Sequence, residues 1–405
     1  MEPTQSKTSS SEYEPSPVHG VSRTTFIVGV SSTLNDTANH MVHPIVPIFL
    51  TNVLGASPIV VGIIEGAAGV VSSLFTLLAG VWSDRTGRRA PFVVGGYLLS
   101  AVSRTLMFVA FSWWFVLVLR ILDRFGRAVR SAARDALIAD SVPKNLLGRN
   151  FGFYNSADNL GSLVGPLIAS GLLVLFNEEI RLVFAFAIIP SLLTVFLLLR
   201  IKDKPASAPI PVKKISFAHY RELPRPFYFV LLVNILFALG NSSDAFIILR
   251  AQQLGVPVAM IPIAGALVSL VAFAVAYPAG ILVDRIGPAK NVTMALVFYI
   301  ITYLGFAYVH LIGTIAIWPL LLIYGGVGVI AGAFKTLIMS SVPKDRRATA
   351  IGIIVTFSGI AALVGNLLAG AMWSLYGSTA TFLLGAAFTA VALVVLLLAR
   401  SAKIF

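Results

Sequence analysis

Long runs of apolar residues, separated by short polar connections, fill most of the chain. Each run approaches ~20 residues, the length of a helix that crosses the ~30 Å hydrocarbon core of a bilayer. The pattern therefore predicts an all-α membrane protein with twelve transmembrane helices. We expect these helices at about 25–50, 57–82, 91–111, 113–136, 150–175, 180–200, 227–250, 256–282, 290–311, 314–337, 348–373 and 378–400.

Two polar segments divide the chain. Residues 1–24 are rich in Ser, Pro and Glu and contain no apolar core or small-residue cleavage site, so they predict a disordered cytoplasmic tail and not a signal peptide. Residues 201–226 are basic and proline-rich, and they separate six predicted helices from six. We therefore expect two six-helix bundles, at 25–200 and 227–405, joined by a cytoplasmic linker at 201–226.

Composition and charge support this class and orient the chain. Of 405 residues, 57% are hydrophobic and 12% charged, and the mean hydropathy is +0.89, far from the composition of a soluble domain. The net charge of +13 comes largely from alternate connections, whereas connections such as 51–56 and 374–379 have no Lys or Arg. Basic loops face the cytoplasm, so we expect both termini there and no nucleic-acid partner.

An internal repeat appears when the sequence is shifted by 200 residues. The shift places Gly80, Asp84, Arg85 and Gly87 on Gly280, Asp284, Arg285 and Gly287. It also matches 141–144 with 341–344 and 163–165 with 363–365. One constant offset across separate blocks predicts two parallel repeats of six helices, an architecture typical of transporters.

The loop after the second predicted helix carries the pattern Gly80-Val-Trp-Ser-Asp84-Arg85-Thr-Gly87-Arg88-Arg. It resembles the signature loop of the major facilitator superfamily, and the resemblance covers about 25–400. Gly80 permits close helix approach and Gly87 a tight turn, while Asp84 and the following cations can pair with neighbouring helix ends. The second copy has Pro288 and Ala289 in place of the last cations.

The fifth predicted helix contains Gly152, Gly161, Gly165 and Pro166. This spacing resembles a motif that the superfamily associates with antiporters, mostly drug–proton exporters, although Ala169-Ser170 replaces the final glycine pair. Small residues and a proline bend also serve helix packing, so packing alone is the alternative explanation.

Charges inside the spans are costly, and they mark cavities or internal partners. The fourth predicted helix carries them along one face, which predicts a polar lining. This face contains Arg120, Asp123, Arg124, Arg127, Arg130, Arg134 and Asp135. By resemblance, Arg120 occupies the place of the family's fourth-helix arginine, whereas Arg124 stands where the family has a glycine.

The first predicted helix also has a polar face, formed by Asn35, Asp36, Asn39, His40 and His43. Asp36 lies midway along the span, where burial and nearby arginines control protonation, and it is the first candidate for proton coupling. The two histidines change charge near neutral pH. They lack a convincing third ligand, so we predict a polar lining or proton relay and no metal site.

These residues, with Glu65, Arg104, Asp158 and Asp244 in other spans, give the predicted roles. Proton-coupling roles fall to Asp36, Glu65, Asp123 and Asp158. Substrate contacts fall to His40, His43, Arg104, Arg120, Arg124, Arg127 and Asp244. Gating roles fall to Gly80, Asp84, Arg85, Gly87, Arg88, Gly161, Gly165, Pro166, Asp284 and Arg285. Internal pairing of the acids with the arginines is the alternative explanation for these charges.

Three functions remain open at this point. The leading one is proton-coupled export of a small amphipathic organic molecule by alternating access. The second is transport of an organic anion, such as a carboxylate, phosphate ester or siderophore, bound by the arginines of the fourth helix. The third is a receptor that keeps the transporter fold without flux.

The sequence lacks the Walker, His-Glu-x-x-His and Gly-x-Ser-x-Gly motifs, so we expect no enzyme and no cofactor. The absence of cysteine excludes disulfides and thiolate sites. We expect a monomer, as is usual in the family, with a small molecule, protons and the bilayer as partners. A short chain with minimal loops indicates a bacterial inner membrane protein.

Overall fold

The computed structural model describes residues 16–86, 88–201, 223–327, 330–343 and 346–402, and these form helices and no β-sheet. Most of the predicted tail and of the predicted linker lies outside these ranges. The first half contains α1 Arg23–Val42, η1 His43–Ile45, α2 Val46–Ile48, η2 Phe49–Val53, α3 Pro58–Thr86, α4 Ala90–Leu106, η3 Met107–Val109, α5 Trp113–Asp140, η4 Lys144–Leu146, α6 Leu147–Leu175, α7 Ile180–Phe186 and α8 Ile188–Leu198. The second half contains α9 Arg225–Gly240, α10 Asp244–Gln253, η6 Val258–Met260, α11 Ile261–Ile286, α12 Pro288–Ile312, η7 Thr314–Ala316, α13 Ile317–Val327, α14 Ile330–Ser341, α15 Arg347–Tyr376 and α16 Ser378–Ser401.

Local sequence explains where α1 begins and where it ends. The Ser22 hydroxyl caps the helix by accepting a hydrogen bond from the Thr25 amide at 3.0 Å. The helix ends at Val42, where Pro44 and then Pro47 lack the amide hydrogen that an α-helix needs. The chain continues through a 3₁₀ turn, a short α-turn and a π-turn, so the predicted span at 25–50 is helical but interrupted.

Nine helical segments in the described ranges are long and apolar enough to cross a membrane. They coincide with nine of the predicted spans. The other three predicted spans, at 25–50, 113–136 and 314–337, are also helical where the structure describes them. The first two carry the polar and charged faces, and the third contains η7, α13 and α14, with residues 328–329 outside the described ranges. The total number of crossings and the 200-residue repeat stay predictions.

The span predicted at 227–250 is broken in its middle. Helix α9 ends at Gly240 and α10 begins at Asp244, and the Ser243 hydroxyl caps the new helix. The Ser243 amide donates to the Asn366 side-chain oxygen of α15 at 2.8 Å, so the exposed backbone of the break has a partner. Asp244 therefore lies at a helix start inside the molecule.

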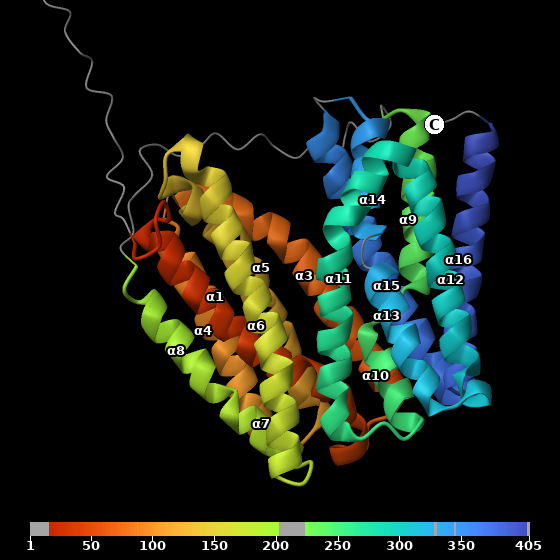
Figure 1. Cartoon of the computed structure of the whole chain (residues 1–405), viewed down its shortest axis with the longest axis horizontal. Coiled ribbons are helices and arrows are strands. Elements are labelled where there is room, and N and C mark those ends of the chain that lie inside the picture. The colour runs from red at the N-terminus through yellow and green to blue at the C-terminus, as the bar shows by residue number, and fades with distance from the viewer. Residues whose placement is uncertain (1–15, 87, 202–222, 328–329, 344–345, 403–405) are drawn as a thin grey trace, which may run out of the picture.

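Helices from the two halves of the sequence lie on opposite sides of the molecule, as the colours of Figure 1 show. Within the first half α1 packs chiefly on α6 and α8, and α5 packs on α3 and α4. The halves meet along two seams, one formed by α3 and α15 and the other by α6 and α11. The candidate site lies beside the second seam.

Candidate functional site

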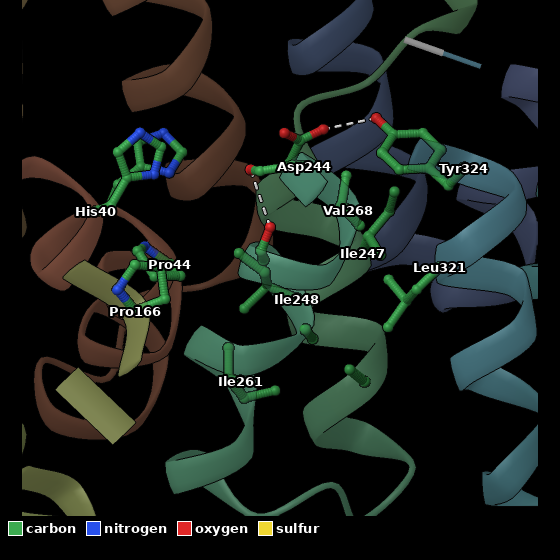
Figure 2. Close-up of a pocket in the computed structure, with 15 residues that line it drawn as sticks. His40, Pro44, Pro166, Asp244, Ile247, Ile248, Ile261, Val268, Leu321 and Tyr324 are labelled. Carbon is green, nitrogen blue, oxygen red and sulfur yellow. Dashed lines mark hydrogen bonds between the residues drawn. The ribbon is translucent and has the colours of Figure 1, made fainter. Parts of the chain in front are cut away.

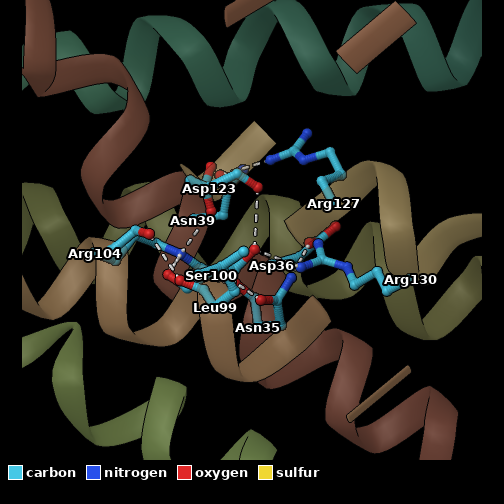
Figure 3. Close-up of polar contacts among 10 residues, drawn as sticks. Asn35, Asp36, Asn39, Leu99, Ser100, Arg104, Asp123, Arg127 and Arg130 are labelled. Carbon is cyan, nitrogen blue, oxygen red and sulfur yellow. Dashed lines mark hydrogen bonds and ion pairs between the residues drawn. The ribbon is translucent and has the colours of Figure 1, made fainter. Parts of the chain in front are cut away.

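The polar face of α1 is fixed by arginines from two other helices. Arg104 of α4 donates to the backbone and side-chain oxygens of Asn35, at 2.9 Å for the backbone oxygen. Arg127 of α5 donates to the Asn39 side-chain oxygen at 2.8 Å (Figure 3). The structure therefore brings the predicted faces of the first and fourth spans together.

Two of the predicted acids form ion pairs within the first half. The Arg120 guanidinium lies 2.6 Å from Glu65, and the side chains are 3% and 9% exposed. Arg104 Nε lies 3.5 Å from Asp123, with side chains that are 4% and 5% exposed. Buried pairs of this kind hold helices α3, α4 and α5 in register, because breaking one leaves an uncompensated charge. This geometry fits the alternative of internal pairing for these four residues.

Two further arginines of the α5 face, Arg124 and Arg127, have no such partner among the described residues. Within the described residues, no carboxylate lies within 4.0 Å of Arg124 or Arg127, both of which are half-buried. Arg127 bonds to the neutral Asn39, and its buried Nε atom has no acceptor among the described residues. Arg124 and Arg127 therefore carry charges that no carboxylate of the described residues neutralises at contact distance.

Asp36 and Asp158 form a second pair of acids, without a cation. Both line a cavity of about 710 Å³ between α1, α6 and α11, whose other walls include Leu270 and Phe273. Asp158 accepts from the Ser32 hydroxyl at 2.5 Å and from the Tyr154 hydroxyl at 3.0 Å. In the part of the chain that the structure describes, neither carboxylate has an arginine, lysine or histidine nitrogen within 4.0 Å.

A smaller cavity of about 140 Å³ extends the polar face of α1 toward the second half. His40 lies on one side and Asp244 on the other, and Tyr324 of α13 donates to Asp244 at 2.6 Å (Figure 2). His43 also lines the cavity, and the remaining walls are mostly apolar. The predicted substrate residues therefore divide: His40, His43 and Asp244 line this cavity, whereas the arginines Arg104, Arg120, Arg124 and Arg127 do not. No three His, Asp or Glu side chains gather as a metal site in the described ranges.

The glycines of the fifth-span motif have different surroundings. A Cβ at Gly161 would overlap the Thr33 carbonyl oxygen, and one at Gly165 would lie 2.5 Å from that of Thr37. Gly152 has open space around it. Gly161 and Gly165 are therefore needed for the close approach of α1 and α6, and Pro166 lines the smaller cavity.

The predicted gating loop is only partly visible. Gly87 and the side chains of Asp84 and Arg85 lie outside what the structure describes, as do contacts of Gly80, and Arg88 is exposed. Arg89, for which the sequence predicts no separate role, is 6% exposed and lies 3.5 Å from Asp140 at the end of α5. In the second copy, Asp284 and Arg285 are exposed and Gly287 turns the chain at φ 84°.

Sequence reasoning missed the hydroxyls around Asp158. Ser32 precedes Asp36 by four residues and Tyr154 precedes Asp158 by four, so each lies on the same helix face as its acid. That spacing was the available signal. The spacing alone does not indicate a bound acid, because serine and tyrosine are common in helices.

Comparisons with known proteins agree with the fold. The family model of the Major Facilitator Superfamily matches residues 26–365. An uncharacterized MFS-type transporter of Methanocaldococcus jannaschii is 32% identical over 380 residues, which cover 90% of this chain and 94% of the relative. The multidrug resistance protein MdtG of Escherichia fergusonii is 27% identical over 380 residues, covering 90% of this chain and 91% of the relative.

Among solved structures, a mutant of the nucleoside transporter NupG matches with a TM-score of 0.78. The sequence identity is 13%, and the match covers 93% of this chain and 99% of that one. At this identity the likeness concerns the fold alone.

Proposed function

The chain belongs to the major facilitator superfamily of membrane transporters, and on this basis we propose that it exports a small amphipathic organic molecule in exchange for protons. The observation that carries the proposal is the pair of acids, Asp36 and Asp158, on the wall of the 710 Å³ cavity. Acids without a cationic partner can take up and release protons as the cavity changes its exposure. Glu65 and Asp123 are held by arginines, so we assign the main coupling role to the unpaired acids.

The smaller cavity is the proposed place for the cargo. Ile247, Ile248 and Val268 give it an apolar wall, while Asp244 and His40 supply polar groups at opposite sides. Such a lining suits a molecule with an apolar body and one or two hydrogen-bonding groups. The multidrug resistance named for MdtG is consistent with export of such a molecule.

Proton exchange can be measured with purified protein in liposomes that contain the pH dye pyranine. We expect ethidium, an amphipathic probe, to move protons through the wild-type protein, and Asp36→Asn to abolish this movement. Asp135→Asn, which removes an exposed acid near the end of α5, is the matched control and should retain it. An Asp36→Asn protein that exchanges at the wild-type rate would contradict the coupling role.

A second candidate is transport of an organic anion. Arg124 and Arg127 favour it, because an anion could supply the carboxylate partner that both lack in the described structure. Charge reversal by Arg127→Glu should then abolish the binding of an anionic probe such as fluorescein and leave ethidium binding intact. Unchanged fluorescein binding by this variant would remove the second candidate.

We further propose that both termini face the cytoplasm and that the chain works as a monomer in a bacterial inner membrane. Basic residues concentrate in the connections on the side of the termini, which supports the orientation. Figure 1 places the start of α1 and the end of α16 on the same side of the molecule. In this orientation, we propose that the carboxyl groups of Asp36 and Asp158 take up protons from the outer side of the membrane and release them to the cytoplasm.

A further inference from the structure

The two acids of the larger cavity have unequal hydrogen-bond donors. One oxygen of Asp158 accepts from two hydroxyls, that of Ser32 at 2.5 Å and that of Tyr154 at 3.0 Å. Asp36 accepts from one amide, that of Asn35, at 2.9 Å. The two acids are neighbours across the contact of α1 with α6, because Asp36 lies one turn from Ser32, which donates to Asp158, and the Asp36 Cβ lies beside Gly161, one turn from Asp158.

A third hydroxyl extends the donor set. The Tyr97 hydroxyl of α4 donates to the Ser32 oxygen at 3.4 Å, which leaves the Ser32 hydrogen directed at Asp158. Arg130 lies over the Tyr97 ring at 4.2 Å and Arg134 over the Tyr154 ring at 4.4 Å. A cation over a phenol ring withdraws electron density and makes its hydroxyl a better donor.

We infer that Ser32 and Tyr154, supported by Tyr97, hold Asp158 as the carboxylate of the pair and leave the exchangeable proton on Asp36. Hydrogen bonds from two hydroxyls stabilise the charged form of the acid that receives them. Two like charges on the wall of one cavity are unfavourable, so we expect the pair to keep one proton on the acid with fewer donors. The three hydroxyl residues are positioning residues, and their role in exchange rests on the proposed function.

Other charged groups lie near Asp36 and Asp158, and they are the same in every variant that the test compares. Arg127 and Arg130 of α5 act on Asp36 electrostatically, and His40 lies one turn away on α1. Arg104 of α4 is bonded to Asn35 and Asp123. Neither α8 nor the cavity-lining residues of α11 contribute a titratable side chain. These contributions therefore cancel when variants are compared.

The test uses the purified full-length chain and needs no substrate. Infrared difference spectroscopy follows the carbonyl band of protonated carboxylic acids as the pH changes, and single-acid backgrounds assign the band. In the Asp36→Asn background, Tyr154→Phe and Ser32→Ala should each move the titration midpoint of Asp158 upward by about one pH unit, or about tenfold in proton affinity. In the Asp158→Asn background, the same changes should leave the midpoint of Asp36 in place.

Two controls keep the result specific. Ser31→Ala removes a neighbouring buried hydroxyl that has no hydrogen-bond partner within the described residues, and it should leave both midpoints unchanged. Tyr303→Phe removes a buried hydroxyl bonded to Ser242 in the other half, and it should also have no effect. Equal midpoints with and without Tyr154→Phe in the Asp36→Asn background would overturn the inference.

The inference and the proposed function can fail separately. If the midpoints move as expected but no probe moves protons into pyranine-loaded liposomes, the hydroxyls distribute the proton and the export proposal fails. If ethidium moves protons but Asp158 titrates independently of Tyr154 and Ser32, the export proposal stands and the positioning role fails.

Discussion

The two seams between the halves differ in how closely their helices approach. At the α3–α15 seam the backbones touch: a Cβ at Gly62 would overlap the Asn366 carbonyl oxygen, and one at Gly370 would lie 2.7 Å from Ile59 Cα. At the α6–α11 seam a cavity of about 710 Å³ lies between the helices. The halves therefore share one close backbone contact, the closed seam (α3–α15), and one contact that leaves room for solvent or cargo, the open seam (α6–α11).

The charges beside the two seams differ in the same way. Glu65 on α3 is held by Arg120 at 2.6 Å, whereas Asp36 and Asp158 at the open seam accept from neutral donors. An acid fixed by a buried cation stays ionised and supports the fold, and an acid without one is free to change charge. The comparison separates residues that hold the structure from residues available for coupling.

The largest expected effect is the loss of the ion pair at the closed seam. Glu65→Gln leaves Arg120 buried without its counter-charge, and we expect the free energy of unfolding to fall by about 3–5 kcal/mol. Asp36→Asn, at the open seam, should cost less than about 1 kcal/mol because it strands no cation. Denaturant unfolding in detergent measures both.

A double variant tests the reason for that loss. In Glu65→Gln with Arg120→Gln no unpaired charge remains, so part of the stability should return. A double variant as unstable as the sum of the two single variants would show that the residues act independently, and the distinction between the seams would fail.

The next effect concerns the glycine contact. Gly62→Ala forces α3 away from α15, and we expect a loss of about 1–3 kcal/mol. Gly69→Ala on the same helix has open space at the Cβ position, and it should be neutral or stabilise by up to about 1 kcal/mol. Equal effects at the two positions would contradict a backbone contact at this seam.

The sequence was informative about the helices and about the polar faces of the first and fourth spans. Apolar runs and charge stripes follow helical geometry directly, so the faces that carry Asp36 and Arg127 could be predicted from spacing alone. The partners of these side chains could not be predicted from spacing, because they come from different helices. The sequence predicts the same coupling role for Glu65 and for Asp158. Only the three-dimensional packing shows that Glu65 faces an arginine, whereas Asp158 faces two hydroxyl groups.

Breaks within spans were also hard to predict. The interruption of α1 follows from Pro44 and Pro47, but the break between α9 and α10 contains no proline. Its backbone is stabilised by Asn366, which is distant in sequence. A partner so distant in the chain leaves no signal in the residues around the break.

A smaller effect is expected at the end of the open seam. Glu178, between α6 and α7, accepts from the Ala259 amide at 3.2 Å and so ties the first half to the start of α11. Glu178→Ala should lower stability by about 0.5–1 kcal/mol, as for other helix caps at an exposed site. Glu179→Ala next to it is the control, and thermal unfolding should show no change. Equal shifts of the melting temperature for the two variants would show that this contact does not link the halves.

The smallest effect is expected for a large side chain inside the open seam. Phe273 is 64% exposed on the cavity wall, so Phe273→Ala should change the free energy of unfolding by less than about 0.5 kcal/mol. Phe382→Ala, at a fully buried position of the second half, should cost about 3–5 kcal/mol. If Phe273→Ala instead destabilises the protein like a core substitution, the α6–α11 seam is packed in solution, and Asp36 and Asp158 have no open cavity through which protons or cargo could reach them.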